Sequence, residues 1–270
     1  MSSVPFTGLK PRVFGHRGAA GLAPENTLPS FALGLALGAD VLELDVHASR
    51  DGVIVVMHDA NLERTTNGAG PLRERSWSEL QQLDAGYHFS RDGHDFPYRG
   101  HGVRMLSLEE LFRAFPQAAC NIEIKQEDPP IVEDALRLIR RVGAQGRLML
   151  AAEHDSIMTE IRRHAGDIPS SFAAGEAADF IARLNGLGFD DYHPAGCALQ
   201  IPARFGTIEL VTAESVAAAH RHGLEVHVWT INQRDEMEQL LGLGVDGIMS
   251  DLPGLARVTV DHGRDVKRIS

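Results

Sequence analysis

The stretch Val41-Leu42-Glu43-Leu44-Asp45-Val46 alternates apolar and acidic residues with a period of two. In an extended strand this period places Glu43 and Asp45 on one face and the apolar residues on the other. If helices cover the outer face of the sheet, as in a β/α barrel, the apolar face points outward and both carboxylates point into the barrel. Two buried carboxylates repel each other unless a cation compensates them. A solvated acidic face or a pair of salt bridges is the structural alternative.

The segment Asn121-Ile122-Glu123-Ile124-Lys125 repeats this alternation further along the chain. Neighbouring parallel strands lie ~4.8 Å apart, so Glu123 can meet the two acids of the earlier strand. Three carboxylates without thiolate or imidazole ligands suit one hard divalent cation, which would be Mg²⁺, Ca²⁺ or Mn²⁺. Lys125 shares the inward face, where it could hold a phosphate oxygen, form a Schiff base or neutralise an acid.

Strand and helix patterns alternate along the whole chain. Eight such repeats in 270 residues predict an α/β fold of the (β/α)8 TIM-barrel type, with an open, doubly wound sheet as the alternative. The predicted strands are 12–15, 41–46, 120–125, 148–152, 170–173, 198–201, 224–230 and 247–250. The predicted helices are 28–37, 108–115, 131–142, 157–164, 177–184, 213–222 and 235–241.

One further strand pattern, over residues 53–57, breaks this alternation. It follows the strand 41–46 too closely for a parallel crossover, which needs about a dozen residues. The two strands are therefore predicted to form an antiparallel hairpin that returns His58 and Asp59 to the barrel mouth. Residues 59–103 then form a small cap insertion in a single domain spanning 1–270, and the polar residues 261–270 form a loose tail.

The composition limits the possible partners. With 26 basic and 37 acidic residues the net charge is −11, so neither nucleic-acid binding nor membrane insertion is expected. An anionic small-molecule substrate then needs a local positive centre. The two cysteines suit a reducing compartment, and the first residues show no signal-peptide pattern, so the expected location is cytoplasmic. The oligomeric state stays open.

Two histidines are expected at the end of the barrel where TIM-barrel active sites are built, which is the C-terminal end of the strands. His16 and Arg17 follow the first strand, and His58 follows the hairpin. An arginine at this end can bind phosphate or carboxylate through two hydrogen bonds. Two imidazoles can act as general base and general acid around one scissile bond. A buried, hydrogen-bonded histidine without a role in chemistry is the alternative.

Other residues near the predicted strand ends carry a weaker signal. Asn26 or Thr27 is expected to cap the first helix, and Glu25 could serve either the cap or the site. Trp229 could line a pocket or belong to the core. Asp251 could cap a short helix or contact a ligand.

Together these motifs resemble the glycerophosphodiester phosphodiesterase family, in its bacterial cytoplasmic type. They occur in family order from about residue 13 to residue 254. They are His16-Arg17-Gly18, Pro24-Glu25-Asn26-Thr27, Glu43-Leu44-Asp45-Val46, Asp51-Gly52, His58-Asp59, Arg64-Thr65-Thr66-Asn67-Gly68, Leu108-Glu109-Glu110, Ile122-Glu123-Ile124-Lys125, Trp229-Thr230-Ile231-Asn232 and Asp251-Leu252-Pro253.

The resemblance implies a TIM barrel with an insertion after the hairpin. It implies a reaction that cleaves glycerophosphodiesters to sn-glycerol 3-phosphate and an alcohol such as choline, ethanolamine or glycerol. The glycerol 2-hydroxyl would attack first and water would open the cyclic phosphate; direct attack by water, and which histidine acts first, stay open. The implied site consists of Glu43, Asp45 and Glu123 for the cation, His16 and His58 for acid/base catalysis, Arg17 and Lys125 for the phosphoryl oxygens, and Glu25 and Trp229 as pocket lining.

Small departures from the family pattern, Ser107 and Ser250 in place of threonine and Ser49-Arg50 before Asp51, leave this chemistry intact. Three other functions are possible. A lysophospholipase D acting on lipid substrates would need an apolar path to the mouth, and none is recognised in the sequence. A metal-independent lyase or aldolase would use Lys125 as a Schiff base. A protein that binds phosphodiesters without cleaving them is the third.

Overall fold

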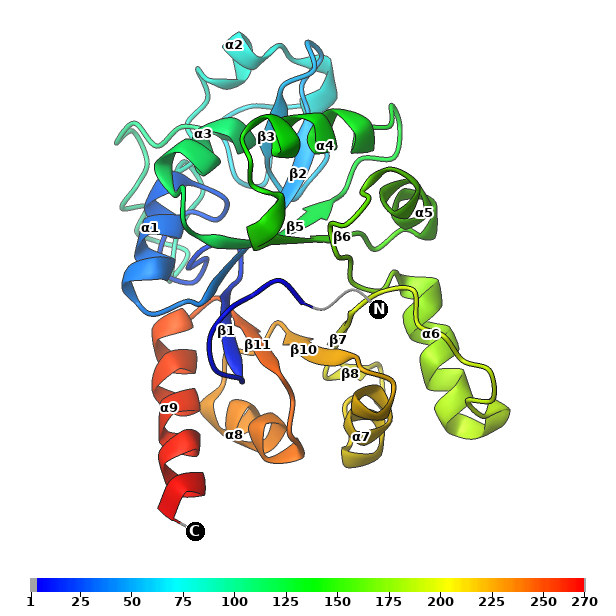
Figure 1. Cartoon of the computed structure of the whole chain (residues 1–270). Coiled ribbons are helices and arrows are strands. Elements are labelled where there is room, and N and C mark those ends of the chain that lie inside the picture. Colours follow the sequence, from blue (N-terminus) through cyan, green and yellow to red (C-terminus); the bar gives the residue numbers. More distant parts are fainter. Residues whose placement is uncertain (1–3, 270) are drawn as a thin grey trace.

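Parallel strands form the centre of the molecule and helices surround them (Figure 1). The computed structural model describes residues 4–269, with side chains as far as Arg264. The parallel strands are β1 (Arg12–Gly15), β2 (Val41–Ala48), β5 (Ala119–Ile124), β6 (Leu148–Ala151), β7 (Ala198–Pro202), β10 (Glu225–Trp229) and β11 (Gly247–Ser250). The strands from β1 to β6 pair in this order, β7 pairs with β10, β10 pairs with β11, and β11 pairs with β1.

The ring closes between β6 and β7 through a short extended segment. Ser170 forms a parallel bridge with Leu150 of β6, and Ser171 forms one with Ala198 of β7. The predicted strand over 170–173 is therefore reduced to two bridging residues, because the chain turns into the next helix at Ala174. With this segment in the place of the eighth strand, the predicted (β/α)8 TIM barrel is confirmed.

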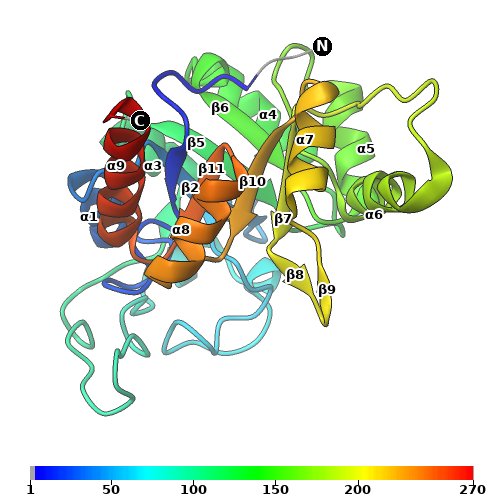
Figure 2. The ribbon, with the colours of Figure 1, turned by 90° about the horizontal axis from the view of Figure 1, so that it is seen from below.

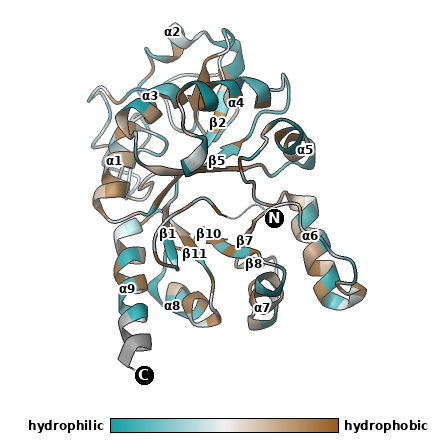
Figure 3. Cartoon of the chain, in the orientation of Figure 1, coloured by the Kyte–Doolittle hydropathy of each residue, from teal (hydrophilic) through white to brown (hydrophobic). Residues whose placement is uncertain are grey.

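Helices cover the outer face of the ring, as the strand–helix alternation predicts. In Figure 3 several of them alternate between apolar and polar residues along their length, as expected when one helix side packs on the strands. They are α1 (Leu28–Ala36), α3 (Leu108–Ala114), α4 (Val132–Arg141), α5 (Asp155–His164), α6 (Ala174–Ala182), α7 (Ala213–Arg221), α8 (Arg234–Leu243) and α9 (Pro253–Ile269). Among residues 4–269, no helix is both long and apolar enough to cross a membrane.

The alternation in β2 works as expected. Leu42, Leu44 and Val46 belong to the apolar cluster that joins β2 and β5 to the helices outside them. Every residue of β2 is buried, including the acids, so Glu43 and Asp45 occupy the interior of the barrel. Burial of apolar surface contributes ~25 cal/mol per Å² to folding, so the outward-facing apolar side chains of β2 stabilise the fold.

The predicted hairpin and the insertion after it also form. β3 (Ile54–Val56) pairs antiparallel with β2, and β4 (Leu106–Ser107) pairs antiparallel with β3. Between β3 and β4 the chain is mostly loop, with a short 3₁₀ turn η1 (Leu72–Glu74) and the helix α2 (Trp77–Leu80). These loops project from the strands on the same side as a hairpin that the sequence does not predict, formed by β8 (Arg204–Phe205) and β9 (Ile208–Glu209) (Figure 2).

Residues 261–269, which are expected to belong to a loose tail, continue the helix α9. Asp261 pairs with Arg257 one turn earlier, at 2.7 Å from Arg257 Nη2, and this pair stabilises the helix beyond the buried residue Val260. Arg264 donates hydrogen bonds to the carbonyl oxygens of Leu9 and Pro11, which fix this end of the helix against the start of β1.

A charged network fills the end of the barrel at which the strands begin. Arg12 of β1 donates to Glu225 of β10 at 2.7 Å, and Lys10 and His227 contact the same carboxylate at 2.7 and 2.9 Å. Burial opposes ionisation of Glu225, but the hydrogen bonds from His227 and Lys10 outweigh it and lower its pKa to about 2. This end is therefore held together by a carboxylate that stays charged.

This network predicts acid-sensitive stability. The pKa of Glu225 is about 2 in the folded protein against 4.5 for a free side chain, so its contribution is present above pH 4.5 and is lost as the pH falls towards 2. The difference corresponds to about 3 kcal/mol. Urea unfolding should show that Glu225→Gln lowers the unfolding free energy at pH 7. The fall in unfolding free energy from pH 7 to pH 3 should be smaller in the variant than in the wild type. An unchanged loss in the variant would contradict this.

Candidate functional site

Three carboxylates meet inside the barrel where β2 lies beside β5. Asp45 is the direct register partner of Glu123, and Glu43 lies two residues earlier on the same face of β2. One carboxylate oxygen of each residue lies within 4.8 Å of the other two. The side chains of Glu43 and Asp45 are only 6% and 2% exposed, and that of Glu123 is 20% exposed. The structure therefore brings together the three acids that the alternation predicts.

The charges of these acids are only partly compensated. Burial and the nearby charge of Asp45 raise the pKa of Glu43 to about 7. Burial also raises the pKa of Glu123. For Asp45, burial acts in the same sense, but the positive charges of Arg17 and Lys125 outweigh it and lower the pKa. The cluster holds more negative charge than its neighbours neutralise.

The donor set fits a hard divalent cation. Its three carboxylates provide closely spaced oxygen ligands of the kind that such ions prefer. Asn26 adds a further oxygen nearby, since its Nδ2 donates to Asp45 Oδ2 at 3.1 Å. The Oδ1 atom of this buried amide accepts no hydrogen bond within residues 4–269. A cation at this place would offset the excess charge of the acids.

His16 lies directly after β1 and is bound to a carboxylate. Its Nδ1 lies 2.7 Å from Asp251 Oδ1, and its Nε2 lies 4.0 Å from Glu43 Oε2. Asn232 orients this carboxylate by donating from Nδ2 to Asp251 Oδ2 at 2.6 Å. Burial opposes protonation of His16, but the hydrogen bond to Asp251 and the charge of Glu43 outweigh it and raise its pKa. The ring therefore directs Nε2 towards the acids.

His58 follows β3 and is bound in a similar way. Its Nδ1 lies 2.7 Å from Oδ1 of the next residue, Asp59. Its carbonyl oxygen lies 3.0 Å from Nε2 of His47, which shares the inward face of β2 with Asp45. The antiparallel pairing of β3 with β2 is what returns His58 to the mouth, as the short connection between these strands predicts.

Two positively charged side chains lie among the acids. Arg17 Nε lies 3.3 Å from Asp45 Oδ2, and Lys125 Nζ lies 2.7 Å from Glu123 Oε1 and 3.6 Å from Asp45 Oδ1. The backbone N–H of Arg17 also donates to Glu43 Oε2 at 2.9 Å. Arg17 and Lys125 therefore both contact the acid cluster, and their charged groups lie on the inner face of the barrel.

The turn that carries Arg17 depends on the glycine that follows it. Gly18 has φ +94°, and its N–H donates to the carbonyl oxygen of Gly15 at 3.0 Å. A Cβ atom at Gly18 would lie 2.6 Å from the carbonyl carbon of Ser30 in α1. Only glycine allows this approach, so the close packing of α1 on the turn fixes where Arg17 projects.

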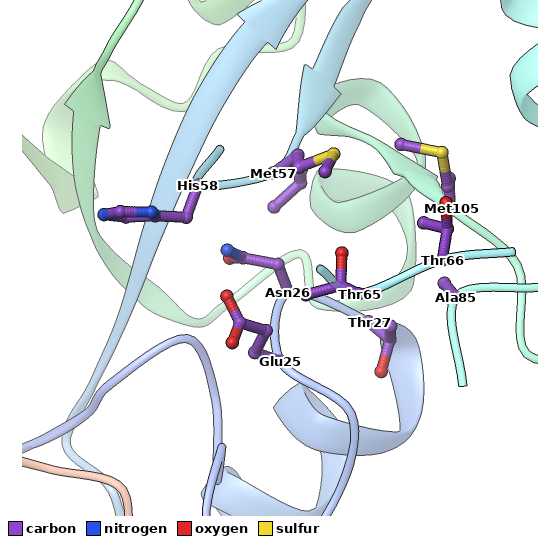
Figure 4. A pocket seen from close by; sticks show the side chains of 10 residues that line it. Glu25, Asn26, Thr27, Met57, His58, Thr65, Thr66, Ala85 and Met105 are labelled. Carbon is purple, nitrogen blue, oxygen red and sulfur yellow. The ribbon is translucent and has the colours of Figure 1, made fainter. Parts of the chain in front are cut away.

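A pocket lies beside His58, between the segment before α1 and the start of the insertion (Figure 4). Glu25 and Asn26 point into it from below His58 in this view. Glu25 accepts a hydrogen bond from Arg17 at 2.8 Å and two from Arg64 at 2.7 Å. Burial opposes the charge of Glu25, but the bonds from Arg64 and the charge of Arg17 outweigh it and lower its pKa. Thr65, Ala85 and Met105 complete much of the wall.

The structure places Thr27 at the N-cap position of α1, as expected, but without the expected hydrogen bond from a side chain. The Asn26 amide donates to Asp45, and the Thr27 hydroxyl donates to the carbonyl oxygen of Pro24 at 2.6 Å, so neither side chain caps the helix. Asn26 has φ +58° and directly precedes the N-cap position. Its backbone N–H bonds to the carbonyl oxygen of Arg17 at 3.0 Å. The segment thus serves the acid cluster instead of the helix.

Trp229 is the last residue of β10, at the same end of the barrel as His16. Its register partner is Pro202 of β7, and its side chain is 42% exposed. An exposed indole is available to line a pocket and is not part of the core. Of the predicted site residues, Trp229 stands two strands from β1 along the ring. His58 contacts Asp59 and His47, and the remaining predicted residues form a chain of contacts around β1, β2 and β5.

Sequence reasoning missed the partners that orient the two histidines. The sequence leaves Asp251 between a cap and a ligand contact, and it assigns no role to Asn232, Asp59 and Arg64. Asp251 lies 235 residues from His16 along the chain, so no local pattern connects the two. The signal that could have found it is its position directly after β11, which is the strand paired with β1.

The comparisons with known proteins agree with this geometry. The family model described as the glycerophosphoryl diester phosphodiesterase family matches residues 16–255. The chain belongs to this family. The match begins at His16 and includes every residue of the candidate site, so the enzyme is a glycerophosphodiester phosphodiesterase, a hydrolase of phosphoric diesters.

Relatives of this phosphodiesterase cover nearly all of the chain. A glycerophosphodiester phosphodiesterase from Bacillus altitudinis is 31% identical over 258 residues, which are 91% of this chain and 96% of the relative. A mouse lysophospholipase D is 26% identical over 271 residues, which are 90% and 83% of the two chains. The structure of an Oleispira antarctica phosphodiesterase in complex with the product sn-glycerol-3-phosphate has a TM-score of 0.76 and 26% identity, and the match covers 93% and 97% of the chains.

Proposed function

We propose that the enzyme hydrolyses glycerophosphodiesters to sn-glycerol 3-phosphate and an alcohol, using one divalent cation and two histidines. The observation that carries this proposal is the pair of carboxylate-bound imidazoles, His16–Asp251 and His58–Asp59, beside three clustered acids. The product bound to the Oleispira antarctica relative supports the choice of product. The substrate is a small molecule.

Glu43, Asp45 and Glu123 would hold the cation. When bound, the cation would withdraw charge from a phosphoryl oxygen and lower the pKa of the attacking hydroxyl. Mg²⁺, Ca²⁺ and Mn²⁺ are the candidates, because the ligands are carboxylate oxygens.

Arg17 and Lys125 would bind the phosphoryl oxygens. Both contact Asp45, so their positive charges stand next to the acids that would hold the cation. A guanidinium offers two parallel N–H donors, and an ammonium offers a compact charge. Glu25 holds Arg17 in place from the pocket side, and Glu25 and Trp229 would line the space for the rest of the substrate.

The two histidines would move the protons. One imidazole accepts the proton of the attacking hydroxyl as the new phosphorus–oxygen bond forms, and the other donates a proton to the leaving oxygen as its bond to phosphorus breaks. Asp251 and Asp59 hold Nδ1 of each ring, so Nε2 is the nitrogen that exchanges the proton. Attack by the glycerol 2-hydroxyl gives a cyclic phosphate that water then opens, whereas attack by water gives the product in one step.

The first test is release of glycerol 3-phosphate from glycerophosphocholine and glycerophosphoethanolamine, with and without EDTA, followed by adding back each cation. We expect release that EDTA abolishes and that one of Mg²⁺, Ca²⁺ or Mn²⁺ restores. Trapping the cyclic phosphate by phosphorus NMR would separate the two modes of attack. Undiminished release in EDTA would contradict the cation, and no release from folded, metal-supplied protein would contradict the substrate.

A lysophospholipase D is the second candidate, because a hairpin that the sequence does not predict exposes two large apolar side chains. Phe205 and Ile208 face each other in the β8–β9 hairpin and are 73% and 58% exposed. The hairpin follows β7 at the end of the barrel that carries the site. The ratio of kcat/KM on glycerophosphocholine and lysophosphatidylcholine decides between the two substrates, and we expect it to favour glycerophosphocholine.

The proposed location is the cytoplasm. Cys120 and Cys197 are both free and buried. Burial raises the pKa of both thiols, to about 11 and about 12, so they stay protonated and unreactive. A reducing compartment suits such residues.

A further inference from the structure

We infer that Arg64 is a positioning residue for His58, acting through Asp59, and that the insertion thereby belongs to the active site. This inference rests on the proposed acid/base role of His58. Arg64 lies near the start of the insertion between β3 and β4, and it is absent from the set of residues expected to contact substrate, cation or phosphate. Its contacts nevertheless join both sides of the site.

The guanidinium of Arg64 holds two carboxylates at once. Nη1 and Nη2 donate to the two oxygens of Glu25 at 2.7 Å each. Nε donates to Oδ2 of Asp59, and Nη2 also lies 3.2 Å from Asp59 Oδ1. Because the guanidinium is planar and its donors are fixed relative to one another, neither carboxylate can rotate without breaking a bond.

This arrangement leaves Asp59 with both oxygens engaged. Oδ2 is bound by Arg64, and Oδ1 lies 2.7 Å from His58 Nδ1. A carboxylate fixed in this way keeps the imidazole proton on Nδ1 and the ring in one orientation, with Nε2 facing the substrate. A change at Arg64 therefore alters which nitrogen of His58 carries the proton, although Arg64 itself does not touch the ring.

The other histidine has the same design built from different residues. Asn232 holds the second oxygen of Asp251 at 2.6 Å while the first oxygen contacts His16. Each histidine therefore has a carboxylate, and each carboxylate has its own orienting side chain. For His58 that side chain comes from the insertion, and its second partner, Glu25, also contacts Arg17 at 2.8 Å. Arg64 thus connects the proposed phosphate-binding and proton-transfer residues.

The kinetic test compares wild type with R64Q, D59N and the double variant D59N/R64Q on glycerophosphocholine. Loss of a residue that orients a functional histidine typically costs about 10–100-fold, and we expect R64Q to lower kcat by about that factor. In the D59N background R64Q should change kcat by less than about threefold, since the route to His58 is already broken. R73Q is the matched control, because Arg73 lies in the same insertion, is equally exposed at 48% and also pairs with a carboxylate, Asp128.

The second test measures the imidazole directly and does not need turnover. In ¹⁵N-labelled protein at pH 8, the ring signals of His58, assigned with H58A, should place its proton on Nδ1. R64Q should shift a measurable fraction to Nε2, and R73Q should not. R64K keeps the charge but loses the fork of donors, and it replaces R64Q if that variant fails to fold.

The outcomes separate this inference from the proposed function. Unchanged tautomer signals in R64Q, full kcat in R64Q, or equal losses in the wild-type and D59N backgrounds would each overturn the role of Arg64. A shifted tautomer in R64Q together with no glycerol 3-phosphate release from the wild type would contradict the substrate and leave the positioning role standing.

Discussion

Replacing Glu43 with glutamine is expected to remove nearly all activity and at the same time make the metal-free protein more stable at pH 8. The carboxylate is one of the three proposed cation ligands, and a catalytic cation contributes several kcal/mol. At ~1.4 kcal/mol per factor of ten, its loss lowers kcat by about 10³-fold or more. Steady-state release of glycerol 3-phosphate at saturating cation measures this effect.

The gain in stability follows from the charge of the acid cluster. Burial and Asp45 raise the pKa of Glu43 to about 7, against 4.5 for a free side chain. Ionised Glu43 therefore costs folding free energy above pH 7 and nothing below pH 4.5, and the full difference is about 3 kcal/mol. Glutamine removes this cost but can still accept the hydrogen bond from the Arg17 N–H.

The control for both effects is Asp134→Asn on the outside of α4, where an exposed carboxylate pairs with Arg137 at 2.6 Å. It should change neither activity nor stability by much, because exposed ion pairs contribute only about 0–1 kcal/mol. Thermal unfolding in EDTA at pH 8 and pH 5 measures the stability. A Glu43→Gln protein that is less stable than wild type at pH 8, or equally shifted at both pH values, would be inconsistent with this account of the cluster.

Removing either imidazole is the second large effect. His16→Ala and His58→Ala should each lower kcat by about 10²–10⁴-fold, which is the usual contribution of a general acid or base. Both rings lie at the mouth and bond mainly through Nδ1 to a neighbouring carboxylate, so the barrel itself should survive their loss. Initial rates on glycerophosphocholine, with far-UV circular dichroism as a check of folding, make the measurement.

His94→Ala provides the matched control, since His94 is an exposed histidine of the insertion. It should keep wild-type turnover. Near-normal rates for both His16→Ala and His58→Ala would exclude the acid/base pair. A loss in one variant alone would leave the reaction with a single proton-transferring histidine.

The parts of the site that local patterns encode could be predicted from the sequence. A period of two in β2 and β5 is enough to send Glu43, Asp45 and Glu123 inward, because sheet geometry alone determines the face. The hairpin that returns His58 follows from the shortness of its connection. The barrel follows from the repeated strand–helix pattern, since parallel strands need helices to connect them.

The rest depends on contacts between distant residues, or on competition that a local pattern does not reveal. His16 meets Asp251 only because β11 pairs with β1 and closes the ring. Asn26 has the chemistry of a helix cap, but Thr27 occupies the N-cap position and the Asn26 amide nitrogen donates to Asp45. The hairpin that contains Phe205 and Ile208 could not be predicted, because each of its strands has only two residues and shows no recognisable alternation.

The strands of the barrel are joined by ladders of unequal length, and the link between β6 and β7 is a short one. The ladder that joins β2 to β5 runs from the Val41–Ala119 pair to the Val46–Ile124 pair. In contrast, β6 and β7 are connected through the single bridges at Ser170 and Ser171. Regions with few backbone bonds open at the lowest free-energy cost. Local opening of the ring should therefore cost less free energy at this link than along the ladder that holds Asp45 beside Glu123.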